Sequence, residues 1–293
     1  MFDPAAPIEA SVTPDTLQSL SEPSKACIKR LLAHFSNSAE SKYLLSSEPG
    51  GKLAAVLVLL YEEDGELRVL LTTRSKSLRT HPGQTALPGG RVDAEDDNFV
   101  VTAMREANEE VGLRLNCPDI HVLGLLDPQI SLYRIAVAPV VALLTKPDIL
   151  RSLKAAEDEV DRIFSHPLEA ILDPSLAKKE KLVDIGSEDW PYQNNFYNTS
   201  DSQVPLLGNM TYRMHRFRSS ASPIKGMTAE VLIKTAEIAY NKPPVYDHFA
   251  PGQLRDFASL MAALKQASKE APNGAAPLTS IPIPAPTPGT GGH

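Results

Sequence analysis

One short segment of this 293-residue chain constrains the fold most, because it combines an apolar stripe with a cluster of carboxylates. Between Asn98 and Val111, apolar residues recur at intervals of three and four, namely Val100, Met104, Ala107 and Val111. This spacing predicts a helix that buries one face against a core. Asp97 or Asn98 can cap its start, and Gly112 can take the left-handed position after its end. The rest of the chain must therefore supply an apolar surface for this helix.

The other face of the predicted helix carries Glu106, Glu109 and Glu110, which are three and four residues apart. Each like-charge neighbour costs roughly a few tenths of a kcal/mol. A solvated acidic face is the ordinary interpretation of such a cluster alone. Here Gly89 and Gly90 precede the helix, and glycines let the backbone approach a ligand closely. Oxygen ligands without nearby His or Cys suit Mg²⁺ or Mn²⁺ bound together with a diphosphate.

Strand signals surround this helix. Leu53–Tyr61 is a continuous apolar run, and a turn at Asp64 and Gly65 connects it to the β-rich Arg68–Thr73, which predicts a hairpin. Further strands are predicted at residues 121–126, 135–144, 159–164 and 212–218. Helices are predicted at residues 24–35, 167–172 and 228–240. Short connections between strands favour an α/β fold with a mixed sheet between helices.

Composition sets outer limits on structure and partners. The net charge of −7 argues against a basic nucleic-acid-binding surface, and no apolar run is long enough to span a membrane. Cys27 and Cys117 match no metal or redox spacing and are expected to be reduced thiols. Residues 1–22 are expected to be flexible and residues 23–49 to form a helical extension. Residues 50–245 are expected to form the main domain, residues 246–270 a helical segment, and residues 271–293 a disordered Pro/Ala/Gly tail.

The carboxylate helix and its surroundings resemble the Nudix box, the signature of hydrolases that cleave a diphosphate linked to another moiety. The matching residues are Gly90, Arg105, Glu106, Glu109, Glu110, Gly112 and Leu113. The segment departs from the box at one point: Arg105 comes one residue late, and an aspartate, either Asp96 or Asp97, stands for the first glutamate of the box. The resemblance implies an α/β/α sandwich.

A second resemblance lies just upstream. Residues 70–75, with Arg79, Gly83 and residues 87–90, resemble the element of the coenzyme A-specific branch of this family. The two resemblances together imply a small-molecule substrate: hydrolysis of coenzyme A and its thioesters to 3′,5′-ADP and a 4′-phosphopantetheine product. They also imply Mg²⁺ or Mn²⁺ on Glu106, Glu109 and Glu110, with Arg105 in the catalytic set. Other Nudix substrates, such as an oxidised nucleotide, and a non-catalytic binding module are the alternatives.

The substrate-binding candidates lie within the upstream element and where it joins the box. They are Arg74, Arg79, His81, Gly83, Gln84, Gly89 and Gly90. Arginines suit the phosphates of coenzyme A because a guanidinium can donate two parallel hydrogen bonds to one phosphate. His81 has a structural role as an equal alternative. Which group acts as general base stays open.

Two groups of residues carry weaker indications. Glu159 is a candidate for an additional acidic group from a later loop. The aromatic residues between Trp190 and Tyr197 can either stack on the substrate or pack on themselves. His166, His215 and His248 show no metal-like spacing and are interpreted as structural or surface residues. The start of the chain lacks the features of a secretory or transit peptide, and Thr290–His293 is not a peroxisomal Ser-Lys-Leu-type signal. We therefore expect a cytoplasmic protein, with peroxisomal import by another route as the alternative.

Overall fold

The computed structural model describes residues 12–13, 15–36, 52–131, 135–204 and 210–255, together with residues 259 and 262. The α-helices in these ranges are α1 (Glu22–Ser36), α2 (Phe99–Val111) and α3 (Gly226–Tyr240). Short 3-10 helices are η2 (Asp15–Leu17), η4 (Pro147–Ser152), η5 (Glu169–Ile171) and η6 (Pro174–Lys179). The longer strands are β1 (Lys52–Glu63), β2 (Glu66–Arg74), β5 (Ile120–Leu125), β7 (Ile135–Leu144), β8 (Val160–Pro167), β9 (Tyr197–Val204) and β10 (Met210–Phe217). The two- and three-residue strands are β3 (Thr85–Ala86), β4 (Gly89–Arg91), β6 (Gln129–Ile130) and β11 (Ile224–Lys225).

A mixed sheet forms the centre of the molecule. Its strands follow the order β3-β2-β1-β7-β5, and β4, β6 and β8 pair with β1, β7 and β2. β1 and β7 run parallel, whereas β1 and β2 form an antiparallel hairpin. The turn of that hairpin uses Asp64 and Gly65, both with positive φ, as two-residue hairpins require. The predicted hairpin is confirmed.

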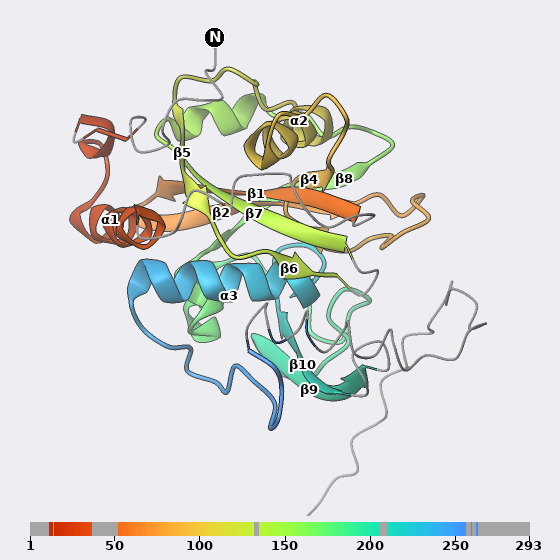
Figure 1. Cartoon of the computed structure of the whole chain (residues 1–293). Helices are drawn as coiled ribbons and strands as arrows, with labels where there is room; N and C mark the ends of the chain where they lie inside the picture. The colour runs from red at the N-terminus through yellow and green to blue at the C-terminus, as the bar shows by residue number, and fades with distance from the viewer. Residues whose placement is uncertain are drawn as a thin grey trace, which may run out of the picture.

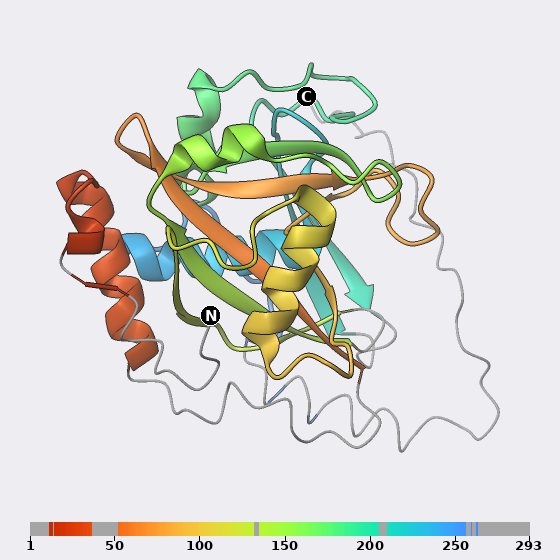
Figure 2. The same cartoon turned by 90° about the horizontal axis from the view of Figure 1, so that it is seen from above.

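Helices cover both faces of this sheet (Figures 1 and 2). α2 packs on one face with its predicted stripe: Val100, Ala107 and Val111 are buried and Met104 is partly buried, in a core that includes Leu57 and Leu59. α1 and α3 pack on the opposite face, where a second hydrophobic core includes Ile28, Leu31 and Leu232. The expectation of an α/β/α sandwich with a mixed sheet and an N-terminal helix is confirmed.

A second sheet, which the sequence analysis did not anticipate, lies beyond α3 (Figure 1). It contains β9, β10 and β11, all antiparallel. The predicted strand at residues 212–218 is its middle strand and is not part of the central sheet. β9 falls in a segment for which the sequence predicted no strand. Its residues are mostly exposed, so the alternating apolar pattern that identifies a half-buried strand is missing.

The connection after β8 differs from its prediction. A short helix was expected over Pro167–Leu172, but Pro167 is the last residue of β8 and the helix is the 3-10 turn η5. The Leu168 amide donates a 2.8 Å hydrogen bond to the Leu67 carbonyl. Pairing with β2 therefore keeps the chain extended through Pro167, and Leu168, with helical φ and ψ, begins the turn.

Several other expectations concern the chain outside these elements. Cys27 and Cys117 are both buried and free. The predicted tail at 271–293, residues 1–11 of the expected flexible start and most of the 246–270 segment lie outside the described residues. The domain boundaries therefore stay predictions. Within the ranges that the structure describes, no helix is both long enough and apolar enough to cross a membrane.

Candidate metal and diphosphate site

α2 is fixed at both ends by the residues that the sequence pointed to. The Asn98 side chain accepts hydrogen bonds from the amides of Val100 and Val101 at 3.0 and 3.1 Å, so Asn98 and not Asp97 is the cap. Gly112 follows the helix with φ of 71° and donates its amide to the Asn108 carbonyl at 2.9 Å. These caps set where α2 starts and ends, and so they set which residues face the β4 loop.

The three glutamates lie at increasing depth beside β4. The Glu109 side chain is 53% exposed, Glu106 is 17% exposed and Glu110 is 7% exposed. Burial raises the pKa of Glu106. Burial also raises the pKa of Glu110 to about 7, against the hydrogen bond from the Gly89 amide and the charge of Arg74. Two of the three carboxylates are thus held where their negative charge is poorly compensated.

The two glycines of β4 contact this cluster directly. The Gly89 amide donates to Glu110 Oε2 at 3.2 Å, and Gly89 has φ of 155°, where side chains are strained. A Cβ on Gly90 would lie 2.4 Å from the carboxylate of Glu106. The missing side chain at Gly90 leaves room for the Glu106 carboxylate, whereas a Cβ at Gly89 would clash with Ala55 and Val56 of β1. The carbonyl groups of the same segment are further oxygen donors of the kind that Mg²⁺ accepts.

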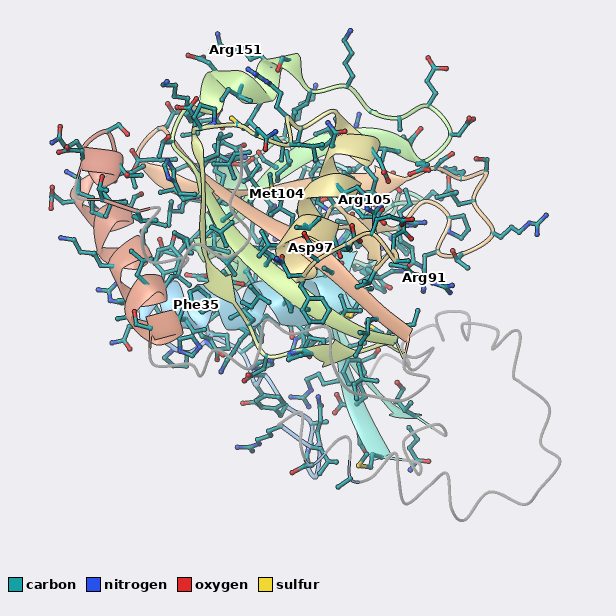
Figure 3. The ribbon with its side chains drawn as sticks, turned by 45° about the horizontal axis from the view of Figure 1, so that its top comes forward. Phe35, Arg91, Asp97, Met104, Arg105 and Arg151 are labelled. Atoms are coloured by element: carbon teal, nitrogen blue, oxygen red, sulfur yellow. The ribbon has the colours of Figure 1, made fainter. Side chains whose placement is uncertain are left out.

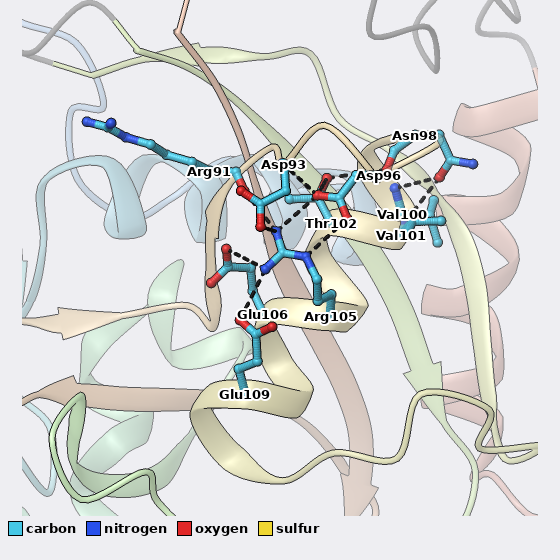
Figure 4. Close-up of polar contacts among 10 residues, drawn as sticks. All are labelled: Arg91, Asp93, Asp96, Asn98, Val100, Val101, Thr102, Arg105, Glu106 and Glu109. Atoms are coloured by element: carbon cyan, nitrogen blue, oxygen red, sulfur yellow. Dashed lines mark hydrogen bonds and ion pairs between the residues drawn. The ribbon is translucent and has the colours of Figure 1, made fainter.

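Arg105 holds the start of this face in place (Figure 4). Its Nε and Nη2 donate to the two oxygens of the buried Asp96 carboxylate at 3.0 and 2.9 Å. Its Nη1 donates to Glu106 and Glu109 at 3.1 Å each. Asp96 also accepts from Thr102 at 2.8 Å, so of the two aspartates Asp96 is the one bonded to Arg105 and α2. Figure 3 shows Arg105 on α2 beside the loop that carries Asp97.

The loop from Arg74 to Gln84 folds back toward the same cluster. The Arg74 amide donates to the Gln84 carbonyl at 2.9 Å, and the Gly83 amide donates to the Arg74 carbonyl at 3.1 Å. Arg74 Nη1 lies 3.8 Å from Glu110 Oε1, and Arg74 Nε is buried without a partner among the described residues. Partial desolvation and the charges of Arg74 and Lys225 lower the pKa of His81, which is therefore neutral near pH 7.

The remaining sequence candidates are placed differently. Arg79 is exposed at the tip of the loop, and no ion pair joins it to a residue that the structure describes. Glu159 lies near the site, because its carbonyl accepts from the Ser75 amide at 2.8 Å and its charge acts on Glu110. Trp190 is fully buried, donates to the Asn194 carbonyl at 2.7 Å and packs edge-to-face on Tyr192. Its ring therefore packs within its own segment.

One cluster that sequence spacing did not indicate lies on the other side of the sheet. His215, Glu230 and His248 each bring a possible ligand atom within 4.8 Å of the others. They come from β10, α3 and the segment after α3, so no local motif could have joined them. His166, the third histidine considered, is fully buried in β8, and burial lowers its pKa to about 4.

The residues around α2 fit a divalent cation. They offer carboxylate oxygens on one face and backbone carbonyls from β4, which is the donor set that Mg²⁺ and Mn²⁺ prefer. A cation there would also compensate the charge of Glu106 and Glu110, which the protein alone leaves costly to ionise.

The chain is similar to several known proteins. Residues 51–184 match the NUDIX domain family. The mitochondrial Nudix hydrolase 15 of Arabidopsis thaliana is 33% identical over 216 residues, covering 72% of this chain and 68% of that protein. The peroxisomal coenzyme A diphosphatase ndx-8 of Caenorhabditis elegans is 42% identical over 126 residues, or 42% of this chain and 52% of that protein. A crystal structure of a C. elegans Ap4A hydrolase binary complex aligns with a TM-score of 0.34 and 21% identity, covering 41% of this chain and 83% of that one.

Proposed function

The chain belongs to the Nudix hydrolase family, and on that premise we propose that it hydrolyses the diphosphate bond of coenzyme A and its derivatives. The products would be 3′,5′-ADP and 4′-phosphopantetheine or its acyl form. The observation that carries this proposal is the position of Glu106 and Glu110 against the bare backbone of Gly89 and Gly90. A cation bound by these two carboxylates would lie beside the backbone of β4.

The residues around α2 would have different roles in this reaction. Glu106, Glu109 and Glu110 would hold Mg²⁺ or Mn²⁺, which when bound neutralises charge on the diphosphate oxygens. Arg105 is a positioning residue, because its guanidinium is taken up by Asp96 and by two of the glutamates. Arg74 Nη1 lies 3.8 Å from Glu110 Oε1, and the partly exposed guanidinium can donate to a substrate phosphate.

Two findings favour coenzyme A over other diphosphates. The loop from Arg74 through Gly83 and Gln84 to Gly90 carries the element that resembles the coenzyme A-specific branch, and it folds onto the Glu110 end of the site. One relative with 42% identity is named a coenzyme A diphosphatase. Arg79 and His81, in the same loop, would contact the substrate. Support for the site itself is independent of this choice of substrate.

A substrate panel tests the proposal. Purified full-length protein with Mg²⁺ or Mn²⁺ would be given coenzyme A, acetyl-coenzyme A, ADP-ribose and 8-oxo-dGTP, and the products would be separated by ion-exchange chromatography. We expect 3′,5′-ADP to form from coenzyme A with a kcat/KM at least about tenfold above that for the other two classes. Preferred cleavage of 8-oxo-dGTP would identify an oxidised nucleotide, and not coenzyme A, as the substrate. Metal-dependent turnover of none of them would favour a binding module.

A further inference from the structure

Two positive side chains face each other across the second sheet. Arg216 on β10 is the direct cross-strand partner of Lys225 on β11, and both are partly buried. Like charges at such positions have Cβ atoms about 5 Å apart and destabilise a sheet. Burial and the charge of Arg216 both lower the pKa of Lys225. The fold therefore maintains two adjacent cations at a cost in stability.

No carboxylate compensates this pair within the described ranges. Arg216 Nη1 contacts only neutral oxygens, of which the nearest is Ser200 Oγ at 3.0 Å, and no ion pair or hydrogen bond of Lys225 Nζ is found there. Another arginine on the same strand shows the alternative. Arg213 on β10 is the cross-strand partner of Asp201 on β9 and donates two hydrogen bonds to it at 2.7 and 2.8 Å. At the equivalent register position opposite Arg216, β9 carries Asn198.

The neighbouring aromatic residues fix the direction of the Arg216 side chain. The Arg216 guanidinium lies 5.5 Å from the centre of the Tyr192 ring, and that ring packs edge-to-face on the buried Trp190. A cation held over an aromatic ring loses little additional freedom when it binds an anion. The aromatic segment that the sequence analysis left with two interpretations thus supports a charged group.

The pair is connected to the α2 site through the loop from Arg74 to Gln84. The Thr85 hydroxyl donates to the Ser222 carbonyl at 2.6 Å, and the Thr228 hydroxyl lies 3.5 Å from the Thr85 carbonyl, so β11 and the start of α3 are tied to β3. His81 lies within the fields of both Arg74 and Lys225. His81, in the loop that leads to Glu110, is thus affected by charges from both the α2 site and the second sheet.

We propose that Arg216 and Lys225 form a second anion subsite that binds a phosphate monoester of the substrate, separate from the diphosphate that is cleaved. A phosphate monoester carries a charge of about −1.5 to −2 near pH 7, which matches two cations, and its oxygens suit the fork of a guanidinium. This inference rests on the proposed function, under which the group is the ribose 3′-phosphate of coenzyme A. The second sheet then has a role in substrate choice.

Coenzyme A and 3′-dephospho-coenzyme A differ only in this phosphate and provide the test. Steady-state kinetics of the full chain with Mg²⁺ would compare the wild type with Arg216→Gln, Lys225→Gln, Lys225→Arg and Lys234→Gln. Lys234 is an exposed lysine of α3 and serves as the matched control. We expect each glutamine variant at the pair to raise KM for coenzyme A about tenfold with kcat little changed, and to leave KM for the dephospho substrate unchanged. Lys225→Arg and Lys234→Gln should behave like the wild type.

The outcomes separate the two proposals. If both substrates lose affinity equally, or neither does, the subsite is overturned while the coenzyme A activity stands. If the wild type cleaves neither substrate, the proposed function fails, and calorimetric titration with 3′,5′-ADP and 5′-AMP then decides the subsite alone. Tighter binding of 3′,5′-ADP that Lys225→Gln abolishes would support the subsite. Equal binding of the two nucleotides would overturn it.

Discussion

Two clusters of titratable side chains lie on opposite sides of the central sheet, and they differ in how their charges are balanced. The α2 cluster consists of Glu106, Glu109 and Glu110. The α3 cluster consists of His215, Glu230 and His248. Both bring several possible metal ligands together. Only the α2 cluster has ligand groups whose charge the surrounding protein leaves poorly compensated.

The α3 cluster forms a closed hydrogen-bond network. Glu230 accepts from Tyr212 at 3.1 Å and from His248 Nε2 at 3.0 Å. His215 Nε2 lies 2.8 Å from the His248 carbonyl, which can only accept, so Nε2 carries the proton and Nδ1 accepts from Tyr197 at 2.8 Å. Each possible ligand atom thus already has a partner. A balanced cluster stabilises the fold, whereas an unbalanced cluster is suited to an external cation.

The largest expected effect is on activity and is confined to the α2 cluster. Glu109→Gln and Glu110→Gln each should lower kcat by at least about 100-fold, or roughly 2.7 kcal/mol, because each removes a ligand charge. Steady-state kinetics on the best substrate of the panel measures this, and circular dichroism checks folding. Glu95→Gln changes an exposed glutamate of the preceding loop and should be neutral. Full activity in both ligand variants would contradict the role of α2.

A second expected effect distinguishes a residue that stabilises the α2 region from a residue that acts in the reaction. Burial opposes ionisation of Asp96, but hydrogen bonds from Arg105, the Asp93 amide and Thr102 outweigh it and lower the pKa of Asp96. Asp96→Asn should therefore lower the free energy of unfolding at pH 7 by about 2–3 kcal/mol, as measured by urea denaturation. Glu109→Gln, which changes a half-exposed group, should leave it nearly unchanged.

The Asp96 contribution also has a predictable pH dependence. Because the pKa is lower in the folded than in the unfolded state, the stabilisation is present above the unfolded value of 3.8 and is lost as pH falls below it. The unfolding free energies of the wild type and Asp96→Asn should therefore converge in acid. A constant difference between them down to the acid-unfolding range would show that Asp96 does not act through its charge.

The sequence predicted most of the α2 region because its signals are local. The stripe from Val100 to Val111, the cap at Asn98 and the glycine at 112 all lie within one helix and its ends, and the structure has them as expected. The choice between Asp96 and Asp97 needed the fold. It depends on which carboxylate meets Arg105, nine residues further along in the sequence, and the two candidates are adjacent.

The α3 side could not be predicted in the same way because its interactions join distant segments. β9 is formed by polar residues that obtain their order from pairing with β10 and not from an apolar face. Glu230 lies 18 residues from both Tyr212 and His248 along the chain. Arg216 and Lys225 become neighbours only through the register of β10 and β11. None of these relationships leaves a periodic signal in the sequence.

A third and smaller effect tests which cluster receives a metal. Addition of Mg²⁺ or Mn²⁺ at ten times its dissociation constant should stabilise the folded protein by about 1.4 kcal/mol, or about 3–5 °C in Tm. Differential scanning fluorimetry should show this increment in the wild type and in His248→Gln, and its loss in Glu109→Gln. An increment that disappears in His248→Gln and persists in Glu109→Gln would place the cation at the α3 cluster and reverse the comparison.

The smallest expected effect concerns pH and the α3 cluster. Burial acts against the charged form of His248, but hydrogen bonds and charges from Glu230 and Glu237 prevail and raise the pKa of His248 to about 9. A raised folded-state pKa stabilises the protein fully below the unfolded value of 6.5, and this contribution disappears as pH rises through 9. His248→Gln should therefore cost about 1 kcal/mol at pH 6 and much less at pH 9.5, as measured by urea denaturation. Glu237→Gln removes one of the two charges that act on His248. It should therefore lower the folded-state pKa of His248, so that the stabilisation is lost at a lower pH than in the wild type. A cost of His248→Gln that stays constant from pH 6 to pH 9.5 would mean that packing, and not the balanced charge, is what this cluster contributes.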